Sequence, residues 1–167
     1  MSFLRRGFPA SKNILVVSDE VYEHIIFDGL EHQSVSRFPK LAERSFIISS
    51  FGKTFHATGW KMGYCLAPEN LMVEFRKVHQ FLVFAVNTPI QMALAEFLKK
   101  KENYLELGNF YQKKRDYFCD LIKNSKFSFD PAPGTYFQLL RYEDITKEKD
   151  TDYAVRLVKE FKIACIP

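Results

Sequence analysis

Two short apolar runs, each followed at once by polar residues, predict strands of a parallel sheet. Residues 14–17 read Ile-Leu-Val-Val before Ser-Asp-Glu, and residues 45–50 read Ser-Phe-Ile-Ile-Ser-Ser before a glycine-containing turn. Continuous apolar runs of this kind are typical of strands covered on both faces. Ligands of open α/β sheets bind at the carboxyl ends of such strands. The polar residues after both runs are therefore candidates for a binding site.

The pattern then becomes helical. Residues 63–67 predict a third strand, which Pro68 ends. Apolar residues recur at helical spacing over residues 69–82, and Pro89 suits the first turn of another helix. A long helix is expected over about residues 104–124.

The C-terminal part changes character after residues 130–134, Asp-Pro-Ala-Pro-Gly, which break regular structure. A strand is expected over residues 135–140, and Asp150 or Thr151 is expected to cap a final helix. The expected buried stripe of that helix is Ala154, Leu157, Val158 and Phe161. Residues 163–167 look like the start of a further strand.

These elements predict an α/β fold with a mainly parallel sheet, flanking helices, a long helix and the start of a small α+β domain. The predicted division has three parts: a partial large domain at residues 1–103, a connecting helix at 104–124, and a partial small domain at 125–167.

Composition narrows the class of protein. The net charge of +4 comes from 24 basic residues scattered among 20 acidic ones, so nucleic-acid binding is a weak alternative. Cys65, Cys119 and Cys165 are widely spaced and have neither disulfide nor zinc-site patterns, which favours a reducing, cytoplasmic setting and no metal. Neither a signal peptide nor a membrane span is expected.

Five polar residues at or near the ends of the first two strands form a chemical set: Asp19, Tyr22, Ser50, Lys53 and Lys61. Each alone is an ordinary turn or surface residue. Together they supply an amine for an aldehyde, a carboxylate for a ring nitrogen, a donor for a phenolic oxygen, and groups for a phosphate. The set therefore predicts a site for pyridoxal 5′-phosphate.

The segments that carry this set resemble the signature segments of class I/II aminotransferases of fold type I. These segments are residues 18–24, SDEVYEH, and residues 49–64, SSFGKTFHATGWKMGY. Further similarity lies in residues 76–80, 84–91 and 134–137. The Ser-x-Gly-Lys-Thr turn, with a lysine at position 61, resembles the branch of the family that acts on kynurenine and methionine.

The resemblance implies a role for each matched residue. Lys53 is expected to bind the cofactor covalently as an imine and to move the proton of the substrate Cα. Asp19 is expected to pair with the pyridine nitrogen, and Tyr22 to donate to the phenolic oxygen. Ser50 and Lys61 are expected to hold the phosphate.

A further residue, Phe84, matches a position that lines the substrate pocket from the neighbouring subunit of a homodimer. A large ring there suits methionine or aromatic side chains, although Phe84 also fits an ordinary core position. His24 and His56 lie within the signature segments, where we expect local hydrogen bonds and assign no catalytic role.

Complete members of the family are much longer than this chain. The phosphate loop, the aromatic residue that stacks on the ring and the Asn-Pro-x-Gly segment have no match in residues 1–12, and neither Arg141 nor Arg156 lies at the motif that binds the substrate carboxylate. We therefore expect the chain to be a fragment of a longer protein.

The resemblance implies transamination between an amino acid, with methionine or an aromatic one preferred, and a 2-oxo acid. Two alternatives stay open. A carbon–sulfur β-lyase uses the same cofactor and the same proton abstraction, and a noncatalytic remnant retains part of the fold without turnover.

Overall fold

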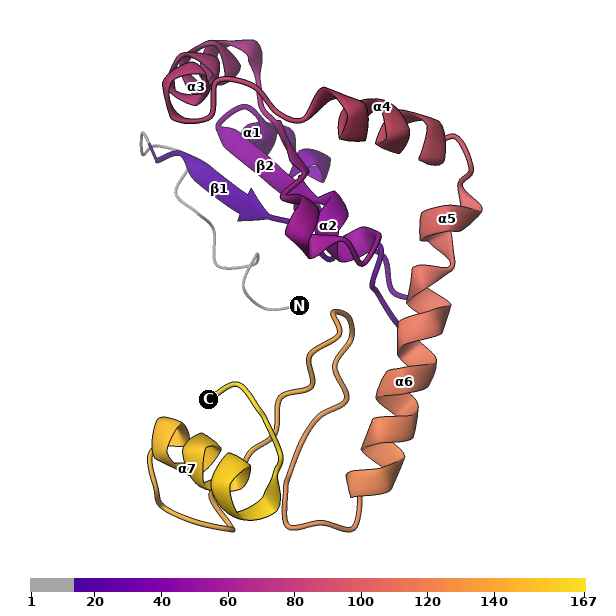
Figure 1. Cartoon of the computed structure of the whole chain (residues 1–167), viewed down its shortest axis with the longest axis vertical. Helices are drawn as coiled ribbons and strands as arrows, with labels where there is room; N and C mark the ends of the chain where they lie inside the picture. Colours follow the sequence, from indigo (N-terminus) through magenta and orange to yellow (C-terminus); the bar gives the residue numbers. More distant parts are fainter. Residues whose placement is uncertain (1–13) are drawn as a thin grey trace. The chain divides into compact units, whose positions relative to one another are not determined.

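The computed structural model describes residues 14–167, which form two compact units (Figure 1). The first unit holds the described residues up to Lys114 together with Pro133–Tyr136, and the second holds Arg115–Ala132 and Phe137–Pro167. The boundary falls inside a continuous helix, so this helix contributes to both units. The predicted three-part division into domains stays a prediction.

The first unit is built on a three-stranded sheet in the order β1-β2-β3 (Figure 1). The strands are β1 (Val16–Asp19), β2 (Ser45–Ser50) and β3 (Gly63–Leu66). β1 and β2 are parallel, whereas β3 runs antiparallel to β2 because the short segment between them turns the chain back. The sheet is therefore mixed, and the carboxyl ends of β1 and β2 lie at the same edge.

The first strand differs from its prediction. β1 begins and ends two residues later than the apolar run, and Val17 is 67% exposed. The prediction that this strand is buried on both faces is wrong for residues 14–167, because β1 is an edge strand of the described sheet and pairs with β2 alone. The predicted strands at residues 45–50 and 63–67 are confirmed as β2 and β3.

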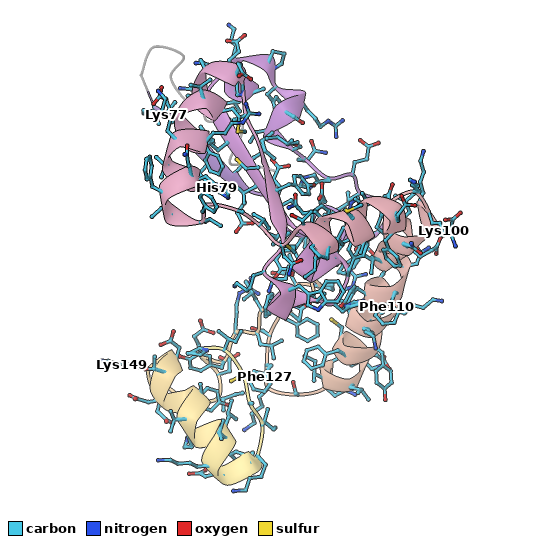
Figure 2. The ribbon with its side chains drawn as sticks, turned by 45° about the horizontal axis from the view of Figure 1, so that its top comes forward. Lys77, His79, Lys100, Phe110, Phe127 and Lys149 are labelled. Atoms are coloured by element: carbon cyan, nitrogen blue, oxygen red, sulfur yellow. The ribbon has the colours of Figure 1, made fainter. Side chains whose placement is uncertain are left out.

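The other regular elements of the first unit are helices and short helical turns. They are η1 (Val35–Arg37), α1 (Pro39–Ala42), α2 (Phe51–Thr54), η2 (Thr58–Trp60), α3 (Glu69–Leu82), α4 (Thr88–Phe97) and α5 (Glu102–Leu105). The predicted helix over residues 69–82 is confirmed as α3, which carries Lys77 and His79 (Figure 2). Its Phe75 ring lies 5.9 Å from the ring of Phe46 on β2. No helix within residues 14–167 is long and apolar enough to cross a membrane.

A small apolar core joins the segment after β1 to the long helix α6 (Leu107–Ile122). Ile25 and Phe27 are each 1% exposed and pack with Leu107. Tyr22, Tyr104 and Tyr111 pack around this cluster. The predicted long helix is confirmed, although its first turn is separate, as α5. The core fixes the residues after β1 against the beginning of α6.

The second unit contains the end of α6, the helix α7 (Asp150–Arg156) and a π-helical turn, η3 (Leu157–Phe161). The predicted final helix is confirmed, but its N-cap is Lys149 and neither Asp150 nor Thr151 holds that position. Tyr153 and Ala154 are its buried residues. The expected buried stripe is only partly correct, since Val158 is 47% and Phe161 57% exposed.

No strand forms over residues 135–140 or 163–167, so these two predictions are wrong for the described chain. Residues 135–140 form no strand in which a neighbouring strand supplies the hydrogen bonds. Instead, the side chain of Gln138 bonds with backbone atoms of the preceding segment. Its amide nitrogen donates to Asp130 O at 2.9 Å, and its oxygen accepts from Ala132 N at 2.9 Å. These contacts fold the segment into a loop. Next to this loop, the backbones of Ser128 and Arg141 form an isolated antiparallel bridge.

Candidate active site

The turn after β2 positions Lys53. Ser50 ends the strand and caps α2, since its Oγ accepts a hydrogen bond from Gly52 N at 3.1 Å. Gly52 is required here because a Cβ would lie 2.8 Å from Thr58 Cα. Thr54 Oγ1 donates to Ser50 O at 3.3 Å. These local bonds fix the turn, and Lys53 follows on its single helical turn.

A cavity of about 490 Å³ opens beside Lys53. Its lining residues are Gly52, Lys53, His56, Thr58, Gly59, Tyr111 and Tyr136. Lys53 Nζ lies 5.8 Å from the centroid of the Tyr136 ring. The hydroxyl of Tyr111 hydrogen bonds with His56 Nδ1 at 3.1 Å, and the centroid of the His56 ring lies 6.3 Å from that of Phe110. The amine of Lys53 is therefore accessible and faces aromatic side chains.

Of the five predicted cofactor-binding residues, Lys53 alone is in this lining; Asp19 ends β1, and Tyr22 follows three residues later and contacts the lining residue Tyr136. Asp19 Oδ1 accepts from Val21 N at 3.3 Å, which holds the carboxylate at the turn. The rings of Tyr22 and Tyr136 meet edge to face, with centroids 5.1 Å apart and planes at 88°. Burial, a hydrogen bond with Tyr136 and the charge of Asp19 raise the pKa of Tyr22. The ring of Tyr22 thus packs against that of Tyr136, which lines the cavity with Lys53.

Lys61 and Phe84 lie outside the cavity lining. Lys61 is exposed and adopts a left-handed conformation at φ 55°, where its N–H donates to Thr58 O at 3.3 Å. Phe84 is 81% exposed, has φ 63° and follows α3. Its predicted contribution concerns a neighbouring subunit and stays a prediction.

Sequence reasoning assigned no role to three residues that line the cavity: His56, Tyr111 and Tyr136. Tyr136 lies in the matched segment 134–137, which was a signal for the site. The sequence pattern placed Tyr111 on the apolar side of the predicted long helix. Nothing in the local sequence shows that this helix contacts the residues just after α2.

Two glutamates that follow β1, Glu20 and Glu23, accept hydrogen bonds that fix the chain around Asp19 and Tyr22. Glu20 is 7% exposed and accepts from Ser18 Oγ at 2.9 Å and Val35 N at 3.0 Å, and it lies 2.8 Å from His32 Nε2. Burial raises the pKa of Glu20, but the hydrogen bonds with His32, Val35 and its neighbours outweigh burial, so the net pKa is lowered.

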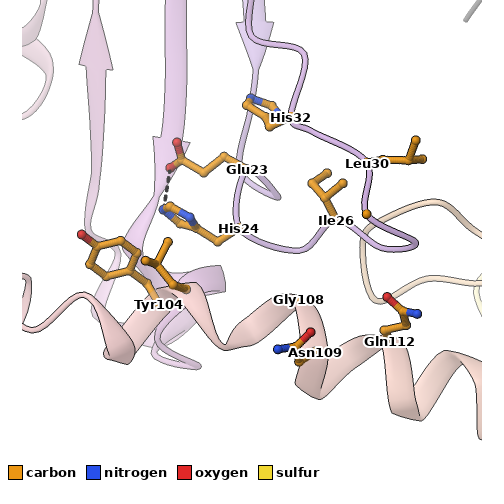
Figure 3. Close-up of a pocket in the computed structure, with 11 residues that line it drawn as sticks. Glu23, His24, Ile26, Leu30, His32, Tyr104, Gly108, Asn109 and Gln112 are labelled. Atoms are coloured by element: carbon orange, nitrogen blue, oxygen red, sulfur yellow. Dashed lines mark ion pairs between the residues drawn. The ribbon is translucent and has the colours of Figure 1, made fainter.

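The second acid, Glu23, joins the turn after β1 to the sheet. Its Oε1 accepts from Ser49 Oγ at 2.8 Å and from the Tyr64 hydroxyl. Burial and the bond with Glu23 raise the pKa of Tyr64 to about 12. His24 Nε2 lies 3.9 Å from Glu23, in a second cavity of about 290 Å³ that Tyr104 also lines (Figure 3). Burial lowers the pKa of His24.

Comparison with known proteins gives consistent matches over this region. Residues 7–167 match the family model described as aminotransferase class I and II. The chain is 47% identical over 159 residues to a methionine aminotransferase of Escherichia coli, and 42% identical over 130 residues to a kynurenine–oxoglutarate transaminase of Dictyostelium discoideum. The first match covers 95% of this chain and 41% of the relative, and the second covers 75% and 29%.

Solved structures agree with these matches. An Escherichia coli crystal structure described as having a methionine aminotransferase function superposes with a TM-score of 0.90 at 47% identity, covering 95% of this chain and 42% of that one. An N-succinyldiaminopimelate aminotransferase of Mycobacterium tuberculosis gives 0.86 at 31% identity, covering 93% and 41%. The chain thus spans about two fifths of the length of these relatives. With nearly its whole length matched by the family model, the chain belongs to the class I and II aminotransferases.

Proposed function

We propose that this chain carries the lysine centre of a pyridoxal-phosphate-dependent aminotransferase, with Lys53 as the residue that binds the cofactor. The observation that supports this most is the position of Lys53, on a turn fixed by Ser50 and Gly52 and beside a cavity of about 490 Å³. Membership of the aminotransferase family supports the same reaction class.

The donor set at this edge of the sheet fits pyridoxal 5′-phosphate. It combines a primary amine on Lys53, a phenol on Tyr22 and a carboxylate on Asp19, and the last two are close enough to interact electrostatically. When bound, the cofactor supplies an aldehyde that combines with primary amines and a ring that takes up electrons from the substrate Cα.

Each residue has a distinct task in this proposal. The amine of Lys53 would hold the cofactor covalently and, when released from it, would accept and return the proton of the substrate Cα. Asp19 keeps the ring nitrogen protonated through its negative charge. Tyr22 donates its hydroxyl proton to the phenolic oxygen. Ser50 and Lys61 bind the phosphate, with Lys61 acting as a mobile point charge.

We infer methionine or an aromatic amino acid as the amino donor and a 2-oxo acid as the acceptor. The names of the two relatives, a methionine aminotransferase and a kynurenine–oxoglutarate transaminase, support this choice. Aromatic side chains around Lys53 also suit apolar substrates. A homodimer, in which Phe84 reaches the neighbouring subunit, and a cytoplasmic setting belong to the same proposal.

The decisive experiment is trapping at Lys53. The purified chain is titrated with pyridoxal phosphate, reduced with borohydride and mapped by peptide mass spectrometry. We expect one adduct, on Lys53, which Lys53→Ala removes. Lys77→Ala is the matched control, because Lys77 is an exposed lysine on α3, paired with Glu74. Labelling spread over surface lysines, with Lys53→Ala unchanged, would contradict the proposal.

A further inference from the structure

The turn that follows Lys53 folds back onto the peptide group that precedes this lysine. Ala57 N donates to Gly52 O at 3.0 Å, and Thr58 Oγ1 donates to the same oxygen at 3.2 Å. Gly52 O belongs to the peptide that joins Gly52 to Lys53. A peptide group is planar, so two bonds to its oxygen restrict the backbone from which the Lys53 side chain extends. The position of Lys53 therefore depends on residues 55–58 as well as on α2.

His56 lies within this turn in a strained conformation. Its φ of 55° is in the left-handed region, which costs conformational free energy for a residue with a Cβ. Such a conformation persists where the surrounding structure holds it. Tyr111 on α6 supplies such a contact, since its hydroxyl hydrogen bonds with His56 Nδ1 at 3.1 Å and the ring centroids are 5.9 Å apart. A phenol can donate or accept, so either tautomer of the imidazole can make this bond.

Tyr111 is itself held by the apolar core. It packs around the cluster of Ile25, Phe27 and Leu107, and its ring centroid lies 5.6 Å from that of Tyr136. Burial and the charge of Tyr136 raise the pKa of Tyr111, so the phenol stays neutral at physiological pH. The hydroxyl that meets the histidine is therefore carried by a fixed ring.

The segment that carries Tyr136 is tied to the chain after β1. Thr135 N donates to Ile25 O at 2.8 Å, and Ile26 and Gly134 form an antiparallel bridge. The aromatic wall of the cavity thus rests on the chain after β1 and on the core, whereas the lysine turn follows β2. A hydrogen bond from the turn to this wall connects two sides of the site that are built separately.

We propose that His56 and Tyr111 are positioning residues for Lys53: their hydrogen bond holds the turn at residues 55–58, and through Gly52 O this turn fixes where the Lys53 amine enters the cavity. The proposal rests on the proposed function and extends it to two residues that act through another residue. Without the bond the turn should open more often, so a smaller fraction of molecules presents the amine in the geometry that binds pyridoxal phosphate.

The test removes the bond from each side. Tyr111→Phe keeps the ring and removes the hydroxyl, and His56→Gly removes the imidazole while the backbone can still adopt the left-handed conformation. The fraction of Lys53 trapped by borohydride is measured against pyridoxal phosphate concentration. We expect half-saturation at a concentration about 2- to 10-fold higher in both variants, the range that one net hydrogen bond produces.

Two further variants separate the bond from other effects. His56→Asn should trap as the wild type does, because an amide atom takes the place of Nδ1 and asparagine tolerates the left-handed conformation. Tyr104→Phe should also match the wild type, since Tyr104 packs around the same core but lies outside the lining of the Lys53 cavity. A loss in His56→Asn equal to that in His56→Gly would overturn the assignment to this bond.

Amide hydrogen exchange, followed by NMR, tests the turn without the cofactor. The Ala57 amide, which donates to Gly52 O, should exchange about 2- to 10-fold faster in Tyr111→Phe, while the amides of β2 keep their rates. Faster exchange together with weaker trapping supports the positioning role. Wild-type trapping in both Tyr111→Phe and His56→Gly overturns it and leaves the proposed function standing. Absence of an adduct at Lys53 in the wild-type chain overturns the proposed function and the positioning role with it.

Discussion

The Oγ of Ser49 donates a hydrogen bond to Glu23 Oε1 at 2.8 Å, and this bond joins the two halves of the candidate site. Ser49 is 2% exposed and lies one residue before Ser50, at the end of β2. Glu23 lies one residue after Tyr22. This contact between neighbours of Tyr22 and Ser50 therefore adds to the pairing of β1 with β2 in holding the segment of Tyr22 beside the turn that carries Lys53.

Glu23→Gln should destabilise the protein. A neutral amide accepts more weakly than a carboxylate, so the bonds from Ser49 and Tyr64 should weaken. We expect a loss of about 1–3 kcal/mol in the free energy of unfolding, measured by urea denaturation. Glu31→Gln is the control, because Glu31 is 75% exposed and its pair with Arg37 lies at the surface. An equal loss in both variants would show that Glu23 has no special role.

Acid should destabilise the protein partly through His24. Burial lowers the pKa of His24 from 6.5, against the charge of Glu23, which raises it, and with that of His32, which lowers it. The folded state thus binds this proton less readily than the unfolded state. The contribution to stability is complete above pH 6.5 and is lost as the pH falls through the lowered pKa.

The check is the free energy of unfolding as a function of pH in His24→Gln. We expect a shallower decline below pH 6.5 than in the wild type, because the group that takes up the proton on unfolding is gone. The control variant is His79→Gln, which replaces a histidine on α3. A wild-type slope in His24→Gln would disprove this assignment.

Gly134→Ala should lower the free energy of unfolding, because the fold leaves no room for a side chain at this position. A Cβ at position 134 would lie 2.8 Å from Ile25 O and 3.1 Å from Ile26 Cδ1. We expect a loss of about 1–3 kcal/mol by thermal or urea unfolding. Gly59→Ala is the control, since a Cβ there has nothing within 4 Å and should change stability by less than about 0.5 kcal/mol. Equal effects of the two variants would be inconsistent with this packing.

Ser50→Ala should weaken the turn that carries Lys53. The variant loses the bond that Ser50 Oγ accepts from Gly52 N, which caps α2. Loss of such a cap costs about 0.5–2 kcal/mol. The measurement is urea denaturation, with Ser128→Ala, at an exposed position, as control. If Ser50→Thr, which keeps the hydroxyl, loses as much stability as Ser50→Ala, the cap is not the cause.

Local patterns predicted the elements whose cause is local. β2 and α3 follow directly from an apolar run and from helical spacing, and the lysine turn follows from Ser50 and Gly52. The strand expected over residues 135–140 failed because the Gln138 side chain takes backbone partners, and residue type does not show this choice.

The candidate site also combines residues placed by local sequence with residues placed by tertiary packing. Ser50 and Lys53 are close because they belong to one turn. Tyr111 and Tyr136 reach Lys53 only because separate parts of the chain are brought together by tertiary packing. Hydrophobic periodicity identifies the side of a helix but not its partner, so the position of Tyr111 in the cavity lining could not be predicted from the sequence pattern.

The backbone hydrogen bonds around Gly134 and Thr135 should allow the side chain at position 136 to be varied. The peptide there is held by Thr135 N on Ile25 O and by the bridge between Ile26 and Gly134, and none of these bonds uses the side chain at position 136. Side-chain identity at 136 is thus separable from the path of the chain. A saturation library at this one codon would sample different cavity walls on a constant scaffold.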